Sequence, residues 1–237
     1  MQYVMDKKDK TMMTIKALVS CVPYVGGGIA SIIGDYYSDR KEQRLMEFIN
    51  EFQKDMIDNQ DKIVREYIES QDFFDVFENI LRDTMNTRTE LKRKMLKNLI
   101  VSSCIIPHTS YERTEEFQHL IDVLTPPSLL ILFVFYKHRD IHMDSNKTHI
   151  DKIWNEIRET TCCDDDALLM DYIGELENRC LIESFKTNTY SVDGGVSLIG
   201  DSPYITKKGL SFYAYITLQN NKVFYNQELP HSLPEAP

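Results

Sequence analysis

The side chains most suited to metal or thiol chemistry lie in the second half of the chain. They are His138, His142 and His149, followed by the adjacent Cys162 and Cys163. Histidine and cysteine are the ligands that zinc prefers, and His138 and His142 would share one face of a helix. No spacing matches a zinc module, however, and neighbouring side chains point in different directions on most backbones. We therefore expect no metal site in this chain.

Signatures of catalysis are absent from the sequence. It contains no GxSxG, HExxH or GxGxxG motif, and Gly26-Gly27-Gly28 lacks the Lys-Ser/Thr pair of a phosphate-binding loop. The five cysteines are odd in number and include no CxxC pair, which favours a reducing cytosol over a disulfide scaffold. We expect a cytoplasmic, non-enzymatic protein with no catalytic residues and no cofactor.

Charge is distributed unevenly between the two halves of the chain. The net charge is −10, and residues 106–237 hold 11 Lys and Arg against 20 Asp and Glu. This imbalance argues against a broad phosphate-binding surface in the second half. Basic residues cluster instead on one expected helix of the first half. They form either an anionic-surface site for lipid or nucleic acid, or, as we prefer, an ordinary solvated face. The residues are Arg88, Lys92, Arg93, Lys94 and Lys97.

Near its beginning the chain has eighteen residues without a charge, residues 17–34. One helix of that length would span about 27 Å, just short of a bilayer core, but proline and glycines disfavour a straight helix. The run is either a buried hairpin, or a segment that a partner releases into a membrane, where small residues let protomers pack closely. The residues assigned to insertion or oligomerisation are Pro23, Gly26, Gly27, Gly28, Ile29, Ile32, Ile33 and Gly34.

The first half of the chain shows the periodicity of helices. Apolar residues at steps of three and four predict one long helix over residues 39–70. Three shorter patterns predict helices around residues 73–81, 91–100 and 117–124, and prolines follow the last two. We therefore expect an all-α bundle with short connections, its domain covering residues 1–125.

After the double proline at 126–127 the pattern becomes mixed. Helices are predicted over residues 128–138, around residues 150–157 and over residues 167–179, the third with Leu168, Leu169, Tyr172, Ile173 and Leu176 inward. Strand-like runs follow at residues 180–185 and 202–206, separated by a polar, glycine-containing stretch. A last helix is predicted over residues 207–219.

This order resembles a winged-helix domain, and the resemblance covers residues 127–218. Its most specific part is the phrase YITKKGLSFYAYI, in which Thr206, Gly209 and Phe212 occupy a hydroxyl-x-x-Gly-x-x-aromatic helix start. The resemblance implies that the third helix is the recognition element. Here that helix carries carboxylates in place of cations, which favours protein interaction over DNA reading.

The phrase VPYVGGGIASIIGDYYSDRKEQRLMEFI resembles small bacterial proteins of mobile elements and phage-defence loci. That likeness implies a defence or interaction role. We thus predict a mainly α protein with an N-terminal helical bundle, a C-terminal winged-helix domain at residues 126–220 and a tail at residues 221–237. It would sense a protein partner, such as a phage-encoded one, form homo-oligomers and contact the membrane on activation. One alternative is a winged-helix regulator that binds nucleic acid, and a second is a structural adaptor or immunity protein.

Overall fold

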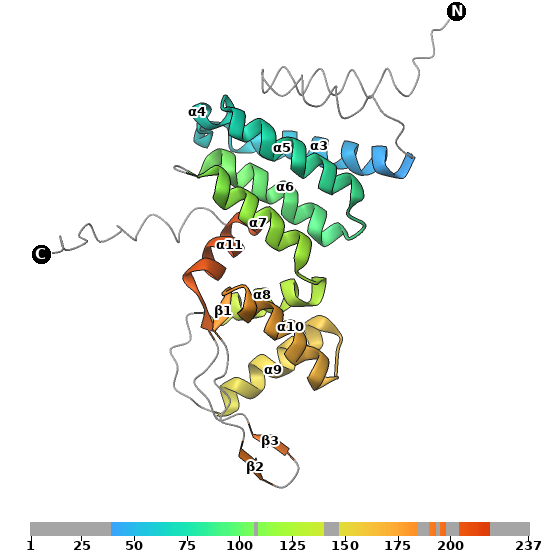
Figure 1. Ribbon diagram of the computed structural model, residues 1–237, viewed down its shortest axis with the longest axis vertical. Coiled ribbons are helices and arrows are strands. Elements are labelled where there is room, and N and C mark those ends of the chain that lie inside the picture. The colour runs from blue at the N-terminus through green and yellow to red at the C-terminus, as the bar shows by residue number, and fades with distance from the viewer. Residues whose placement is uncertain are drawn as a thin grey trace, which may run out of the picture.

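The computed structural model describes residues 39–106, 109–139, 147–183, 190–192, 195–197 and 204–218. The first half of this part is entirely helical (Figure 1). Its elements are helix α3 (Asp39–Asp58), the 3-10 turn η1 (Gln60–Lys62), and helices α4 (Arg65–Ile68), α5 (Gln71–Asn86), α6 (Glu90–Ile105) and α7 (Tyr111–Val123).

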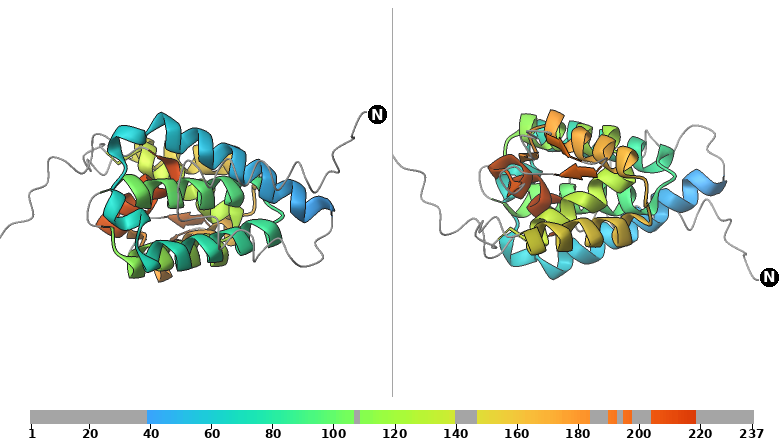
Figure 2. Two further views of the ribbon diagram at one scale, coloured as in Figure 1. Left: turned by 90° about the horizontal axis from the view of Figure 1, so that it is seen from above. Right: turned by 90° about the horizontal axis from the view of Figure 1, so that it is seen from below.

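The second half combines helices with two small antiparallel pairings. Strand β1 (Ile182–Glu183) pairs with β4 (Tyr204–Ile205), and β2 (Tyr190–Val192) pairs with β3 (Gly195–Ser197) to form a hairpin. Both end-on views in Figure 2 show short strands within the outline of the helices. The prediction of a mainly α fold with a small β-hairpin near the end is confirmed. The helices are α8 (Pro126–Lys137), α9 (Lys147–Thr161), α10 (Asp166–Asn178) and α11 (Lys207–Thr217).

The predicted long helix over residues 39–70 is wrong, because α3 ends at Asp58. The Asn59 side-chain amide donates to the Asp55 carbonyl (2.9 Å), and the polar residues that follow offer nothing to bury. The chain then turns, and the Val64 N–H donates to the Cys104 carbonyl at the end of α6 (2.8 Å). A tertiary hydrogen bond therefore replaces the helical one at this point.

Several helices begin at hydroxyl side chains that accept from a backbone N–H. Ser70 caps α5, Ser110 caps α7, Thr125 caps α8 and Thr206 caps α11. At α8 the cap precedes two prolines, whose missing N–H groups cost nothing in a first helical turn. The caps determine the first residue of these helices, which the apolar periodicity alone does not.

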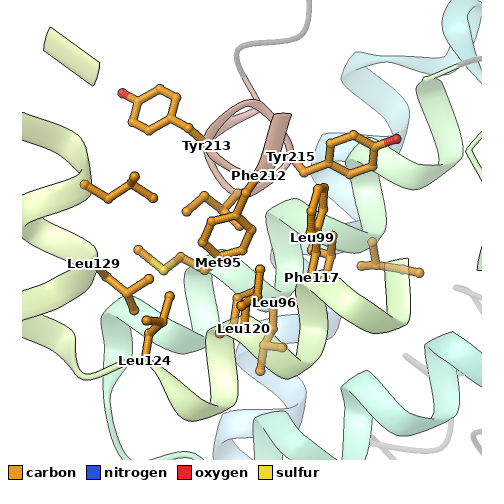
Figure 3. Close-up of a cluster of buried hydrophobic side chains, with 14 of the residues drawn as sticks. Met95, Leu96, Leu99, Phe117, Leu120, Leu124, Leu129, Phe212, Tyr213 and Tyr215 are labelled. Atoms are coloured by element: carbon orange, nitrogen blue, oxygen red, sulfur yellow. The ribbon is translucent and has the colours of Figure 1, made fainter. Parts of the chain in front are cut away.

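One continuous apolar core runs from Leu45 in α3 to Ile216 in α11. Figure 3 shows one cluster of this core, where labelled side chains of α6, α7, α8 and α11 lie close together. The Phe117 ring packs edge-on against both Phe212 and Tyr215, at centroid distances of 5.3 and 5.2 Å. The core includes residues on both sides of residue 125. The predicted domain boundary at that residue stays a prediction.

Helix α11 joins the two halves, and Figure 1 shows it between the α3–α7 bundle and α8. The Asn98 amide donates to the Ile216 carbonyl (2.7 Å), and the Ser102 hydroxyl donates to the Tyr215 carbonyl (2.8 Å). Both α6 side chains are buried, and they satisfy carbonyls that the end of a helix leaves without partners. An ion pair between Lys208 and Glu116 (2.6 Å) adds a link to α7.

Candidate interaction surface

Helix α10 carries acidic and apolar side chains that are exposed at the surface. It begins where the Asp165 carboxylate accepts hydrogen bonds from the N–H groups of Ala167 (2.9 Å) and Leu168 (3.3 Å). One side of the helix packs against α8 and leads into β1, so its position in the fold is fixed. The buried residues on that side are Leu169, Ile173 and Leu176.

One carboxylate of α10 serves the fold itself. Glu175 Oε2 accepts hydrogen bonds from the N–H and the hydroxyl of Thr125, both at 3.0 Å, and from the Ser128 hydroxyl at 2.6 Å. These donors lie at the start of α8, where the helix dipole favours a negative charge. Glu175 therefore ties α10 to α8 and is not available to a partner.

The other carboxylates of this region are less committed. Asp166 forms an exposed ion pair with Arg158 (2.7 Å), a kind of contact that contributes little to stability. Asp164 and Asp171 are exposed, and neither forms a hydrogen bond or ion pair with any residue that the structure describes. Their charges are left to solvent.

Apolar and small residues lie beside these charges. Leu168 is 39% exposed and Met170 is 37% exposed. A Cβ added at Gly174 would meet no described atom within 4 Å, so none of the described residues packs against this position. We define the α10 face as four exposed residues and the half-buried Gly174; the exposed ones are Ala167, Leu168, Met170 and Asp171.

The inward orientation predicted for Leu168 is wrong, although Leu169, Ile173 and Leu176 are buried and Tyr172 is half-buried. At 100° per residue Leu168 lies at the edge of the buried stripe, so the first turn leaves it at the surface. Met170 and Gly174 escaped notice in the sequence. A helical wheel places Met170 beside the stripe of Leu169 and Ile173 and Gly174 farther from it, and would have drawn attention to both.

The predicted anionic-surface residues are partly used inside the bundle. The Lys92 ammonium donates to the Asp122 carbonyl (2.7 Å), and burial lowers the pKa of this lysine. The Arg93 guanidinium donates to the carbonyls of Thr87 (3.2 Å) and Arg88 (2.8 Å), just after α5 ends. Both cations thus satisfy carbonyls at or near the ends of neighbouring helices.

Lys97 is 6% exposed, so it cannot belong to a surface site. Its ammonium is hydrogen-bonded to the Asp55 carboxylate and lies 3.9 Å from Glu51 Oε2, both on α3. Of the five residues, only the side chains of Arg88 and Lys94 are exposed. The structure does not assemble the cluster into one outward-facing patch.

The histidines and cysteines that the structure describes do not gather at a metal-binding group. His138 Nε2 lies 3.0 Å from Glu156 Oε2, and Lys137 contacts the other carboxylate oxygen at 2.7 Å. Hydrogen bonds from Lys137 and then His138 lower the pKa of Glu156. Within the described ranges, no three His, Cys, Asp or Glu side chains could hold a metal ion together, and residues 140–146, including His142, lie outside those ranges.

The glycine-interrupted run also lies outside the described residues, so the assignments to Pro23, Gly26, Gly27, Gly28, Ile29, Ile32, Ile33 and Gly34 stay predictions. Among the described helices, none alone has the length and apolar content to cross a membrane. The pair α7 and α8 passes that test together, with a bend of 118° between the two helices. The apolar residues of α8 are largely buried in the core.

Comparisons of this chain with protein-family models, curated proteins and solved structures gave no significant match.

Proposed function

We propose that residues 126–220 form a winged-helix domain that binds a protein partner through the α10 face, in a chain that has no enzymatic activity of its own. Three helices, a strand, a hairpin, a second strand and a closing helix follow one another in the order that this fold requires. The pairing of β1 with β4 brings together the strands on either side of the hairpin.

The local roles of three residues support this interpretation. The Thr206 hydroxyl caps α11 by accepting from the Gly209 N–H (3.0 Å). A Cβ at Gly209 would lie only 2.0 Å from the Leu181 carbonyl oxygen, so glycine is needed for α11 to approach β1 this closely. Phe212 is fully buried one turn later. The cap, the close approach at the glycine and the buried ring agree with the roles that the resemblance gives these three positions.

The α10 face carries the argument for a protein partner over DNA. The sequence from Cys162 to Asn178 contains no lysine or arginine, and Asp164 and Asp171 have no described counter-charge. Carboxylates so placed would repel DNA phosphates, which dominate the affinity of DNA-binding proteins. Exposed Leu168 and Met170 instead offer apolar contacts of the kind found at protein interfaces.

The alternative of nucleic-acid binding finds few cationic residues elsewhere in this half of the chain. Lys207 and Lys208 are the first two residues of α11, but Lys208 forms an ion pair with Glu116 at 2.6 Å. The wider assignment to bacterial defence, with oligomerisation and membrane contact, depends on residues 17–34 and stays a prediction. A liposome-leakage assay with and without a crosslinking agent tests that part separately.

Photo-crosslinking tests the proposed function directly. A benzophenone amino acid replaces Met170 in the full chain, expressed in its native host, and the same substitution at Ile57 provides the control. Ile57 is 51% exposed but lies on α3, in the other half of the molecule. We expect one protein adduct from position 170 that position 57 does not form. The adduct should decrease when Asp164 and Asp171 are changed to lysine.

Two results would overturn the proposal. One is crosslinking of position 170 to nucleic acid in preference to protein. The other is an identical set of protein adducts from positions 170 and 57, since that would reflect random collisions. Fluorescence anisotropy with a short duplex DNA at low salt adds an independent readout, in which we expect no salt-dependent binding.

A further inference from the structure

The centre of the α10 face is a stripe of small and polar residues at successive turns. Ala167, Asp171, Gly174 and Asn178 follow one another at the spacing of three and four residues that places them on one line. At 100° per residue, Met170 lies on one flank of this line and Leu168 on the other. The face is therefore a shallow, small-residue strip between two exposed apolar side chains.

Gly174 is the unusual member of this stripe. Glycine is less favourable than alanine inside a helix, so a helical glycine normally has a reason that its surroundings reveal. Gly209 has such a reason in the close approach of the Leu181 carbonyl, whereas no described atom comes within 4 Å of a Cβ at Gly174. A helix packed against this strip would supply the missing reason, because small residues let two helix backbones approach closely.

Charge restricts what that helix can be. Asp171 lies on the stripe and Asp164 precedes it, and both are without a described partner. A second copy of this chain, placed with α10 against α10, would bring like charges together, which is unfavourable at an interface. A helix with cationic side chains beside an apolar stripe complements both the carboxylates and the exposed Leu168 and Met170.

We propose that the α10 face is a docking site for a cationic amphipathic helix of a partner protein, packed across Gly174. This inference rests on the proposed function and adds the chemical class of the partner. The apolar side chains of the docked helix contact Leu168 and Met170, and its lysines or arginines lie near Asp164 and Asp171.

A matched pair of synthetic peptides tests the inference with the full chain. Both peptides are amphipathic helices with the same apolar positions, and they differ only in carrying lysine or glutamate on the flanks of the apolar stripe. Titration of each fluorescent peptide with the protein is followed by anisotropy. We expect saturable binding of the lysine peptide and none of the glutamate peptide.

Variants of the protein separate docking from general attraction to a chain of net charge −10. Gly174→Leu should weaken binding of the lysine peptide at least about tenfold, because the larger side chain fills the strip. Asp164→Asn with Asp171→Asn should weaken it about tenfold at low salt. The matched control removes two exposed carboxylates beside exposed Ile57, by Asp58→Asn with Asp61→Asn, and should change binding less than about twofold.

The inference fails if the lysine peptide does not bind, if both peptides bind equally, or if the control pair weakens binding as much as the α10 pair. It also fails if Gly174→Leu leaves the affinity unchanged while circular dichroism shows the fold intact. The proposed function fails by a different observation, the absence of a specific protein adduct at position 170. A specific adduct together with indifference to peptide charge would therefore reject only the cationic class of partner.

Discussion

The first half of α6 is rich in basic residues and the start of α10 in acidic ones, yet the two groups of charges are used differently. On α6, Lys92, Arg93 and Lys97 donate to carbonyls or carboxylates of neighbouring segments, so three of its cations hold the bundle together. On α10, Asp171 forms no hydrogen bond or ion pair with a described residue, and the same holds for Asp164 just before the helix. Concentrated charge therefore indicates a surface for a partner only when the fold leaves it unpaired.

Two glycines of the second half, on α10 and α11, show a similar contrast. Gly209 is required from within, because a Cβ there would clash with the Leu181 carbonyl oxygen at 2.0 Å. Gly174 is required by nothing described, because a Cβ there would point into open space. We expect substitution of a residue with a close internal neighbour, such as Gly209, to lower stability. We expect substitution of a residue without one, such as Gly174, to affect binding of a partner instead.

The largest expected effect is that of Gly209→Ala. The added methyl group must displace either α11 or the backbone at Leu181, so we expect a loss of about 3 kcal/mol in the free energy of unfolding. Urea denaturation followed by circular dichroism measures the change. A loss below about 0.5 kcal/mol, the usual range for surface changes, would mean that this contact is looser than the structure has it.

Lys97→Met is expected to have the next largest effect. Methionine keeps the apolar packing but leaves Asp55 without its ammonium partner, and Asp55 is 21% exposed, so we expect a loss of about 2 kcal/mol. Lys94→Met, on the exposed side of the same helix, should change stability by less than about 0.5 kcal/mol. Equal effects of the two substitutions would remove the distinction between paired and unpaired charges on α6.

The apolar periodicity predicted most of the helices. It could not predict which charged side chains of a helix are buried and which are exposed. The burial of Lys97 depends on Asp55, which lies 42 positions earlier in the chain. Spacing along one helix contains no information about such a partner. The polar residues after Asp58 interrupt the apolar spacing, but spacing alone could not show that α3 ends there, because the Val64 N–H finds its partner in the distant Cys104 carbonyl.

The candidate surface was predictable only in part. The acidic character of α10 can be counted in the sequence, and the helix itself follows from the spacing of Leu169, Ile173 and Leu176. The sequence could not show that Glu175 is hydrogen-bonded within the fold while Asp171 is not, because this difference depends on how the start of α8 packs against α10. The absence of described neighbours around Gly174 is likewise a property of packing. A glycine in a helical sequence pattern does not show whether it is there for a contact within the fold or for a partner.

Within α10, Glu175→Gln tests the paired carboxylate. A neutral amide still accepts hydrogen bonds from Thr125 and Ser128 but removes the charge at the start of α8, so we expect a loss of about 1 kcal/mol. Asp171→Asn is the matched control on the same helix and should stay within about 0.5 kcal/mol of the wild type. Thermal unfolding of both variants measures the difference. If Asp171→Asn were the more damaging of the two, Asp171 would have an internal partner and the α10 face would lose one of its free charges.

Gly174→Ala is expected to have a similarly small effect of the opposite sign. Alanine restricts the unfolded chain and favours the helix, and its methyl group would meet no described atom, so we expect a gain of about 1 kcal/mol. Chemical denaturation measures it beside Gly209→Ala, where the same added atom should cost stability. A loss of stability at position 174 would reveal an internal neighbour and would remove the external reason for this glycine. A gain in stability that comes with weaker binding of the lysine peptide is what the docking proposal requires, because only a partner that approaches the helix backbone makes the less stable residue the useful one.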